Sequence, residues 1–199
     1  CSCFPLSDQT LTVVSLDAVR IVPCVGWKIA RVIAGLCPTT EANLGDGLFD
    51  LPLWLGAEGA VGIGSDSHVS VSPVEELRLL EYGQRLRDRR RNVAATPGVS
   101  TGRRLLDLVV AGGARALGRS GGPGLCVGGR ADIIVLDADA PIFAGQGCDT
   151  FLESWIFSGN VPVVKDVFVG GNHVVQAGRH PREQEIATEY RKVVAGLTA

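Results

Sequence analysis

The sequence predicts an α/β fold in which strand-loop-helix units of the β/α-barrel kind are followed by a small β module and a C-terminal helix. Three observations lead to this prediction. Two short apolar runs, 32–37 and 61–63, each end in polar residues, as parallel strands do at the carboxyl edge of a sheet. From residue 121 onward, glycines punctuate short β-forming runs. Residues 183–197 have the spacing of an amphipathic helix.

The apolar run Val61–Ile63 leads directly to a carboxylate, Asp66, and then to a helix start. Ser72 can cap that helix, Pro73 suits its first position, and Glu75 stands where a capping-box partner belongs. In a β/α barrel the chemistry lies at the carboxyl ends of the strands. Asp66 is therefore a candidate catalytic or metal-binding residue. A structural role, in which it caps a turn by accepting backbone amides, stays open beside the functional one.

The earlier strand, expected at 32–37, ends in a loop that is polar and rich in glycine, residues 38–47. Consecutive parallel strands end at the same edge of a sheet, so this loop is expected to face Asp66. Its candidate residues are Glu41, Asn43 and Asp46, which would contact a substrate or fix the loop. The alternative for Asn43 and Asp46 is turn hydrogen bonding beside the neighbouring glycines.

The C-terminal half contains two further local signals. Residues 103–110 and 113–117 are expected to form two helices, with Gly112-Gly113 as the break between them. Residues 163–169 and 173–176 alternate around Gly170-Gly171-Asn172, which predicts a β-hairpin because glycine and asparagine tolerate positive φ.

These motifs resemble the amidohydrolase superfamily of metal-dependent (β/α)8 barrels and, within it, the formimidoylglutamate deiminases. The most specific match is the loop Pro-Thr-Thr-Glu-Ala-Asn-Leu-Gly-Asp-Gly at 38–47, whereas Gly-Arg-Ala-Asp at 129–132 marks only the superfamily. The resemblance implies the C-terminal part of the barrel at 32–120, a small β-sandwich module at 121–180 and a C-terminal helix at 181–199.

The resemblance also implies a reaction, the hydrolysis of N-formimino-L-glutamate to N-formyl-L-glutamate and ammonia by a zinc-activated water. It assigns Asp66 as a Zn2+ ligand and as the acceptor of the water proton, and His68 as a residue that orients the loop beside the ligands. The alternative for His68 is a role as a replacement metal ligand. Histidine occurs only at 68, 173 and 180, so the histidine ligands of the family have no counterpart here. A catalytic zinc normally has three protein ligands.

The sequence of residues 1–31 does not resemble the corresponding segment of the family. The resemblance implies a strand with a catalytic histidine there, yet no histidine precedes His68. A frame-shifted reading, a truncated and altered product and a divergent segment are the three origins left open.

Composition narrows the classes of partner. A net charge of −2 gives no general attraction to nucleic acid or to an anionic membrane, and the basic run 85–91 suits a helix C-terminus. The six cysteines lack Cys-x-x-Cys spacing and are expected to be reduced thiols. Neither a bilayer-spanning run nor a signal peptide is expected, which predicts a cytoplasmic location.

The partner predicted from the sequence is thus a small molecule, and a homodimer stays open. Part of a barrel leaves strand edges unpaired, so self-association of the isolated chain is expected. Two other functions remain as alternatives: an amidohydrolase that acts on a heterocyclic amine, and an inactive fragment that serves only as a folded or interaction module.

Overall fold

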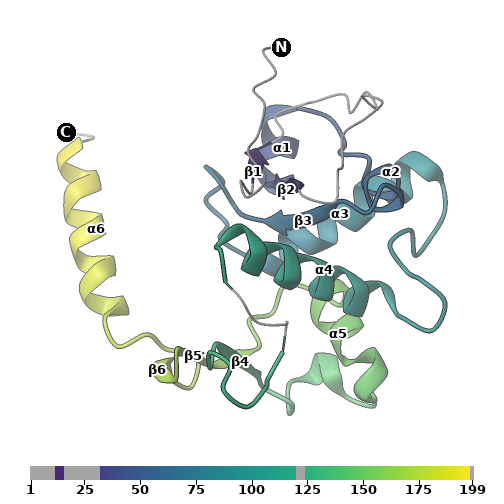
Figure 1. Cartoon of the computed structure of the whole chain (residues 1–199). Coiled ribbons are helices and arrows are strands. Elements are labelled where there is room, and N and C mark those ends of the chain that lie inside the picture. The colour runs from purple at the N-terminus through teal and green to yellow at the C-terminus, as the bar shows by residue number, and fades with distance from the viewer. Residues whose placement is uncertain (1–11, 16–31, 120–123, 198–199) are drawn as a thin grey trace. The chain divides into compact units, whose positions relative to one another are not determined.

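The computed structural model describes residues 12–15, 32–119 and 124–197 of the 199-residue chain (Figure 1). Most of the segment that the sequence sets apart, 1–31, lies outside the described residues. The chain divides into two compact units: residues up to 124 together with 146–158, and residues 125–145 together with 159–199. Each unit is described by itself.

The first unit is built on a parallel sheet of three strands in the order β1-β2-β3, namely β1 (Thr12–Ser15), β2 (Val32–Leu36) and β3 (Ala60–Ile63). In the register of the last two strands, Gly35 lies opposite Gly62 and Leu36 opposite Ile63. The two strands therefore end level with each other. This confirms that their carboxyl ends meet at one edge.

The segment after β2 is helical rather than the polar loop that the sequence predicts. Helix α1 (Pro38–Leu44) begins immediately after Cys37, and α2 (Leu51–Gly56) follows before β3. The Glu41 carboxylate accepts a hydrogen bond from the Cys37 amide at 2.8 Å, which satisfies a free donor at the helix start. Gly45, at φ +78°, ends the helix in the left-handed conformation that glycine favours. The glycine that suggested a loop is thus the C-terminal cap of a short helix.

Helix α3 (Pro73–Asp88) begins where the capping signal places it. The Ser72 hydroxyl accepts a hydrogen bond from the Glu75 amide at 3.3 Å, and a proline lies in the first turn. The reciprocal contact of the capping box takes another form, because the Glu75 carboxylate accepts from the Ser70 hydroxyl. The cap itself is confirmed.

The predicted helix break at Gly112-Gly113 is wrong, because α4 (Thr101–Ala116) runs through both residues. A β-carbon on Gly112 would lie 1.9 Å from the Val61 carbonyl oxygen. Glycine at this position lets α4 approach the backbone of β3, against which it packs (Figure 1). The glycine pair therefore serves close packing, not helix termination.

A further helix, α5 (Cys148–Phe157), lies inside the sequence range expected to form the β module, yet it groups with the first unit and packs on α3 and α4. The core of this unit is formed by buried apolar side chains from the sheet and its helices: Ala34, Leu36, Leu51, Trp54, Val61, Leu77, Leu80, Ala94, Leu105, Val109 and Ile156.

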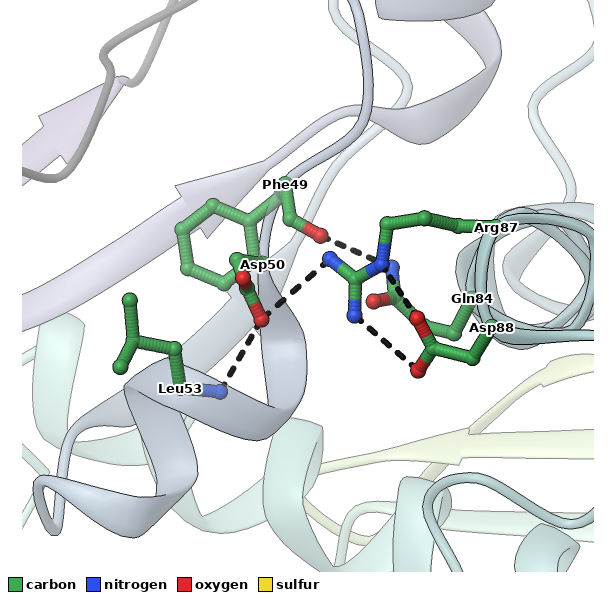
Figure 2. A network of polar contacts seen from close by, with 6 residues as sticks. All are labelled: Phe49, Asp50, Leu53, Gln84, Arg87 and Asp88. Atoms are coloured by element: carbon green, nitrogen blue, oxygen red, sulfur yellow. Dashed lines mark hydrogen bonds and ion pairs between the residues drawn. The ribbon is translucent and has the colours of Figure 1, made fainter.

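The basic run 85–91, which begins in the last turn of α3, engages residues of the same unit. Arg87 reaches Asp88 at 2.7 Å and Asp50 at 3.3 Å, and the Asp50 carboxylate also caps α2 by accepting from the Leu53 amide (Figure 2). Beside it, the Gln84 side-chain amide donates to the Phe49 carbonyl at 2.8 Å. These contacts tie the segment before α2 to the C-terminal part of α3.

The second unit contains an antiparallel sheet in the order β4-β5-β6, formed by β4 (Ile133–Leu136), β5 (Val164–Val169) and β6 (Asn172–Val175). The predicted hairpin is confirmed: Gly170 and Gly171, at φ +57° and +82°, join β5 to β6. A single turn of 3-10 helix, η2 (Pro141–Phe143), and the C-terminal helix α6 (Glu183–Leu197) complete the unit. The second sheet that a sandwich requires stays a prediction.

None of the helices within the described ranges is both long and apolar enough to cross a membrane.

Candidate functional site

The candidate site is the carboxyl edge of β2 and β3. The Gly64 amide donates to the Leu36 carbonyl at 2.9 Å, so the backbone stays paired with β2 for one residue beyond the end of β3. Asp66 follows in a turn, with an exposed side chain and φ of +46°. A positive φ is uncommon outside glycine, and aspartate is among the residues that tolerate it. In the part of the chain that the structure describes, no hydrogen bond or ion pair occupies its carboxylate.

The turn around Asp66 is held by contacts from α1, the helix that follows β2. The Thr40 hydroxyl donates to the Ser65 carbonyl at 2.7 Å and accepts from the His68 amide at 3.1 Å. Thr40 itself is only 4% exposed. Contacts from α1 thus reach the residues on both sides of Asp66.

Helix α1 is in turn fixed by a buried carboxylate on α3. Glu76, 2% exposed, accepts hydrogen bonds from the amide of Thr39, at 2.9 Å, and from its hydroxyl. A buried carboxylate is stable when it is hydrogen-bonded in this way. Sequence reasoning missed both Thr39 and Glu76, although the pair of threonines at the start of the segment and the acid beside Glu75 were visible.

The other predicted residues take distinct positions at this edge. His68 follows Asp66, and its ring Nδ1 accepts from the Ser70 amide at 3.1 Å, which directs that nitrogen toward the loop backbone. Glu41 bonds the Cys37 amide, as described for α1. Asn43 is exposed in the last turn of α1, and the Asp46 amide donates to the Glu41 carbonyl at 3.0 Å. Whether Asn43 or Asp46 contacts a substrate stays a prediction.

Cys37 is a member of this edge that the sequence did not single out. It joins β2 to α1, and a β-carbon on Gly64 would lie 3.7 Å from its sulfur. Burial raises the pKa of the Cys37 thiol, and the negative charges of Asp66, Glu41 and Glu76 raise it further. The thiol is thereby kept from becoming a ready nucleophile.

The described residues do not make up a complete zinc site. Throughout ranges 32–119 and 124–197, no three histidine, cysteine, aspartate or glutamate side chains lie close enough together to hold a metal. His173, in the second unit, is engaged with Asp166 at 2.8 Å. Asp66 can contribute one oxygen ligand, whereas a catalytic zinc normally requires three protein ligands.

Comparison with known proteins identifies relatives of this chain. The profile of the amidohydrolase family matches residues 3–174, so the match begins inside the segment that the sequence analysis set apart. A formimidoylglutamate deiminase of Pseudomonas aeruginosa is 51% identical over 166 residues, which are 83% of this chain and 36% of that protein. This chain thus spans little more than a third of the length of the curated relative that it matches.

Solved structures show the same relationship. An amidohydrolase from Brucella melitensis is 43% identical, with a TM-score of 0.74 over 84% of this chain and 37% of that one. An atrazine chlorohydrolase from Arthrobacter aurescens, complexed with zinc, is 23% identical with a TM-score of 0.65, over 82% of this chain and 41% of the other. An adenosine deaminase from Xanthomonas campestris with bound zinc is 18% identical, with a TM-score of 0.63 over 83% and 38%. At these low identities, the last two structures show only that they share the fold of this chain.

Proposed function

The chain belongs to the amidohydrolase family, and from this premise we propose that it is the C-terminal part of a metal-dependent formimidoylglutamate deiminase. The complete protein would hydrolyse N-formimino-L-glutamate to N-formyl-L-glutamate and ammonia. The observation that carries the proposal is the relative named for this activity, 51% identical over 83% of the chain. The geometry supports it, because Asp66 lies at the carboxyl edge of a parallel sheet.

The fold of this part follows from the same premise. Three parallel strands in sequential order, with helices packed on them, are what a continuous segment of a (β/α)8 barrel would contribute. The antiparallel sheet of the second unit would be one layer of the small β sandwich, with the other layer supplied by residues outside this chain.

Asp66 is the proposed proton acceptor of the reaction. In the hydrolysis of an amidine, a water oxygen bonds to the formimino carbon, the bond from that carbon to the terminal nitrogen breaks, and the nitrogen leaves as ammonia. The water must therefore lose protons and the departing nitrogen must gain them. An exposed carboxylate without a hydrogen-bond partner among the described residues can accept the proton from water and return it to nitrogen.

Zinc is the cofactor that we propose for the complete protein, because related structures were solved with it. Asp66 would be one of its ligands. Because no three ligating side chains cluster among the described residues, the ligand set would be completed by protein outside them. His68 would orient the turn. Glu41, Asn43 and Asp46 are the proposed loop-fixing or substrate-contacting residues of the same edge.

A chimera tests this proposal. The C-terminal part of the Pseudomonas aeruginosa relative is replaced by residues 32–199 of this chain, and ammonia release from N-formimino-L-glutamate is measured. We expect activity, and we expect Asp66→Asn to lower kcat/KM by about 100-fold or more, as loss of a proton-transfer group does. Asp107→Asn is the control, because Asp107 pairs with Arg103 on α4, away from this edge; it should leave activity unchanged.

Two results would contradict the proposal. One is a folded chimera that releases ammonia from a purine, pyrimidine or triazine amine but not from N-formimino-L-glutamate, which would favour the heterocyclic alternative. The other is full activity in Asp66→Asn. For the 199-residue chain alone we expect neither ammonia release nor stoichiometric zinc, since it offers one ligand of the several required.

A further inference from the structure

We propose that Thr40 is a positioning residue whose hydroxyl holds Asp66 in its working backbone conformation. This inference rests on the proposed function only in taking Asp66 as the proton acceptor. The hydroxyl belongs to α1, at the tip of β2, while Asp66 belongs to the turn after β3. Thr40 thus links the ends of two strands, because it bonds Ser65 and His68, which lie 25 and 28 positions after it in the sequence.

The first step of the argument is the conformation of Asp66. Its φ of +46° lies in the left-handed region, which aspartate tolerates better than most residues but which is favoured over extended backbone only where the surroundings stabilise it. The flanking backbone supplies one contact, from the His68 amide to the Ser65 carbonyl at 3.0 Å. That contact closes a turn across Asp66.

The second step is that Thr40 bonds both ends of this turn. Its hydroxyl donates to the Ser65 carbonyl and accepts from the His68 amide. One side chain therefore bonds a backbone group just before Asp66 and another two residues after it. A hydroxyl can do this because it is donor and acceptor at once. The carboxylate between the two contacts is left without a partner among the described residues and faces solvent.

The third step is that Thr40 is itself rigid. It is 4% exposed in the first turn of α1, and the backbone amide of the adjacent residue, Thr39, anchors that turn by donating to the buried Glu76 of α3. A buried side chain on an anchored helix can fix a neighbouring turn to within a fraction of an ångström, which is the precision that positioned catalytic groups need.

Thr39 provides a matched control. The two threonines are neighbours on the same helical turn and are similarly buried, at 8% and 4%. Their hydroxyls differ in partner: Thr39 donates to Glu76, whereas Thr40 bonds the turn of Asp66. Loss of either hydroxyl by substitution with valine removes a buried hydrogen bond. Thr39→Val keeps the backbone amide that bonds Glu76 and anchors the helical turn, so only the Thr40 change removes a contact to the turn of Asp66.

The first measurement is hydrogen exchange by mass spectrometry on the full 199-residue chain, followed in a peptide that covers 65–70. We expect Thr40→Val to speed exchange in this peptide by about 10-fold, because the His68 amide loses one of its two acceptors. Thr40→Ser, which keeps the hydroxyl, and Thr39→Val should exchange as the parent chain does. Equal exchange in Thr40→Val and Thr39→Val would overturn the proposal.

The second measurement is the kinetics of the chimera. Thr40→Val should lower kcat by about 10- to 100-fold with little change in KM, because a displaced catalytic group slows the chemical step without weakening substrate binding. Thr40→Ser should restore kcat, and Thr39→Val should retain it. Faster exchange in Thr40→Val without a loss of kcat would show a merely structural residue and overturn the proposal. An inactive parent chimera would instead contradict the proposed function, while the exchange experiment still decides whether Thr40 holds the turn.

Discussion

The position of Asp66 depends on contacts made by its neighbours. The sequence identifies it by its place after a strand, and leaves open whether it acts chemically or caps a turn. In the structure its carboxylate accepts no backbone amide within the described residues, and the turn is held by Thr40 instead. The turn-capping alternative therefore has no contact to support it.

Cys37 gives a prediction from its raised pKa. At a given pH a raised pKa means a smaller thiolate fraction, so alkylation of Cys37 by iodoacetamide should reach half its maximal rate above the value of about 8.5 that is typical of a free cysteine. The rate is measured against pH by mass spectrometry of the peptide that contains Cys37.

A variant separates the causes of that shift. Burial comes first, and the charge of Asp66 is the largest electrostatic contribution after it. Asp66→Asn removes this charge and should move the midpoint to lower pH without restoring the ordinary value. A midpoint that rises in the variant, or that lies below the ordinary value in the parent chain, would contradict this account.

At the scale of elements, α4 shows how two adjacent glycines can differ in purpose. A β-carbon on Gly112 would meet the Val61 carbonyl oxygen, whereas one on Gly113 would meet nothing within 4 Å. The same residue type therefore permits close helix-strand packing at one position and only weakens the helix at the next.

This contrast predicts opposite effects on stability. Gly112→Ala should destabilise the chain by several kcal/mol or prevent folding, because α4 must move away from β3 and core contacts are lost. Gly113→Ala should raise the free energy of unfolding by about 0.5–1 kcal/mol, the usual gain from alanine in a helix interior. Urea denaturation compares the two variants with the parent. Similar midpoints for both would show that α4 does not approach β3 as described.

The capping elements were the most predictable. Ser72, Pro73 and the Gly170-Gly171 hairpin act through contacts with residues close in sequence, and the structure has all three where the pattern places them. Helix α1 was not predicted, because at 7 residues it is too short to be stable by itself and part of its support comes from Glu76, a residue of α3 that lies 37 positions from Thr39.

At the scale of the whole molecule, the residues that the structure describes include exposed apolar surface and strand edges without a partner among those residues. Within the described residues the parallel sheet has three strands, so β3 has no partner on its outer edge. No residue of α6 is buried, and one side of this helix carries exposed apolar side chains: Ile186, Tyr190, Val193 and Leu197. Open edges and exposed apolar faces favour association.

We therefore expect the isolated chain to self-associate. Light scattering coupled to size exclusion should give a mass above the 20.9 kDa of one chain. The chimera should self-associate less, because the relative supplies protein that this chain lacks. A clean, stable monomer of the 199-residue chain would contradict the prediction.

The sequence by itself determined the α/β class, the level ends of the two strands, the caps and the hairpin, since these follow from apolar spacing, capping residues and turn chemistry close along the chain. It also indicated the family, through the resemblance of its motifs to those of known proteins. Only the tertiary structure decided that the segment after β2 is a helix, that Gly112 faces a carbonyl of β3 and that Thr40 and Glu76 belong to the site. Each of those facts depends on atoms brought together from distant positions. No local pattern encodes such contacts, because they exist only once the strands and helices have packed.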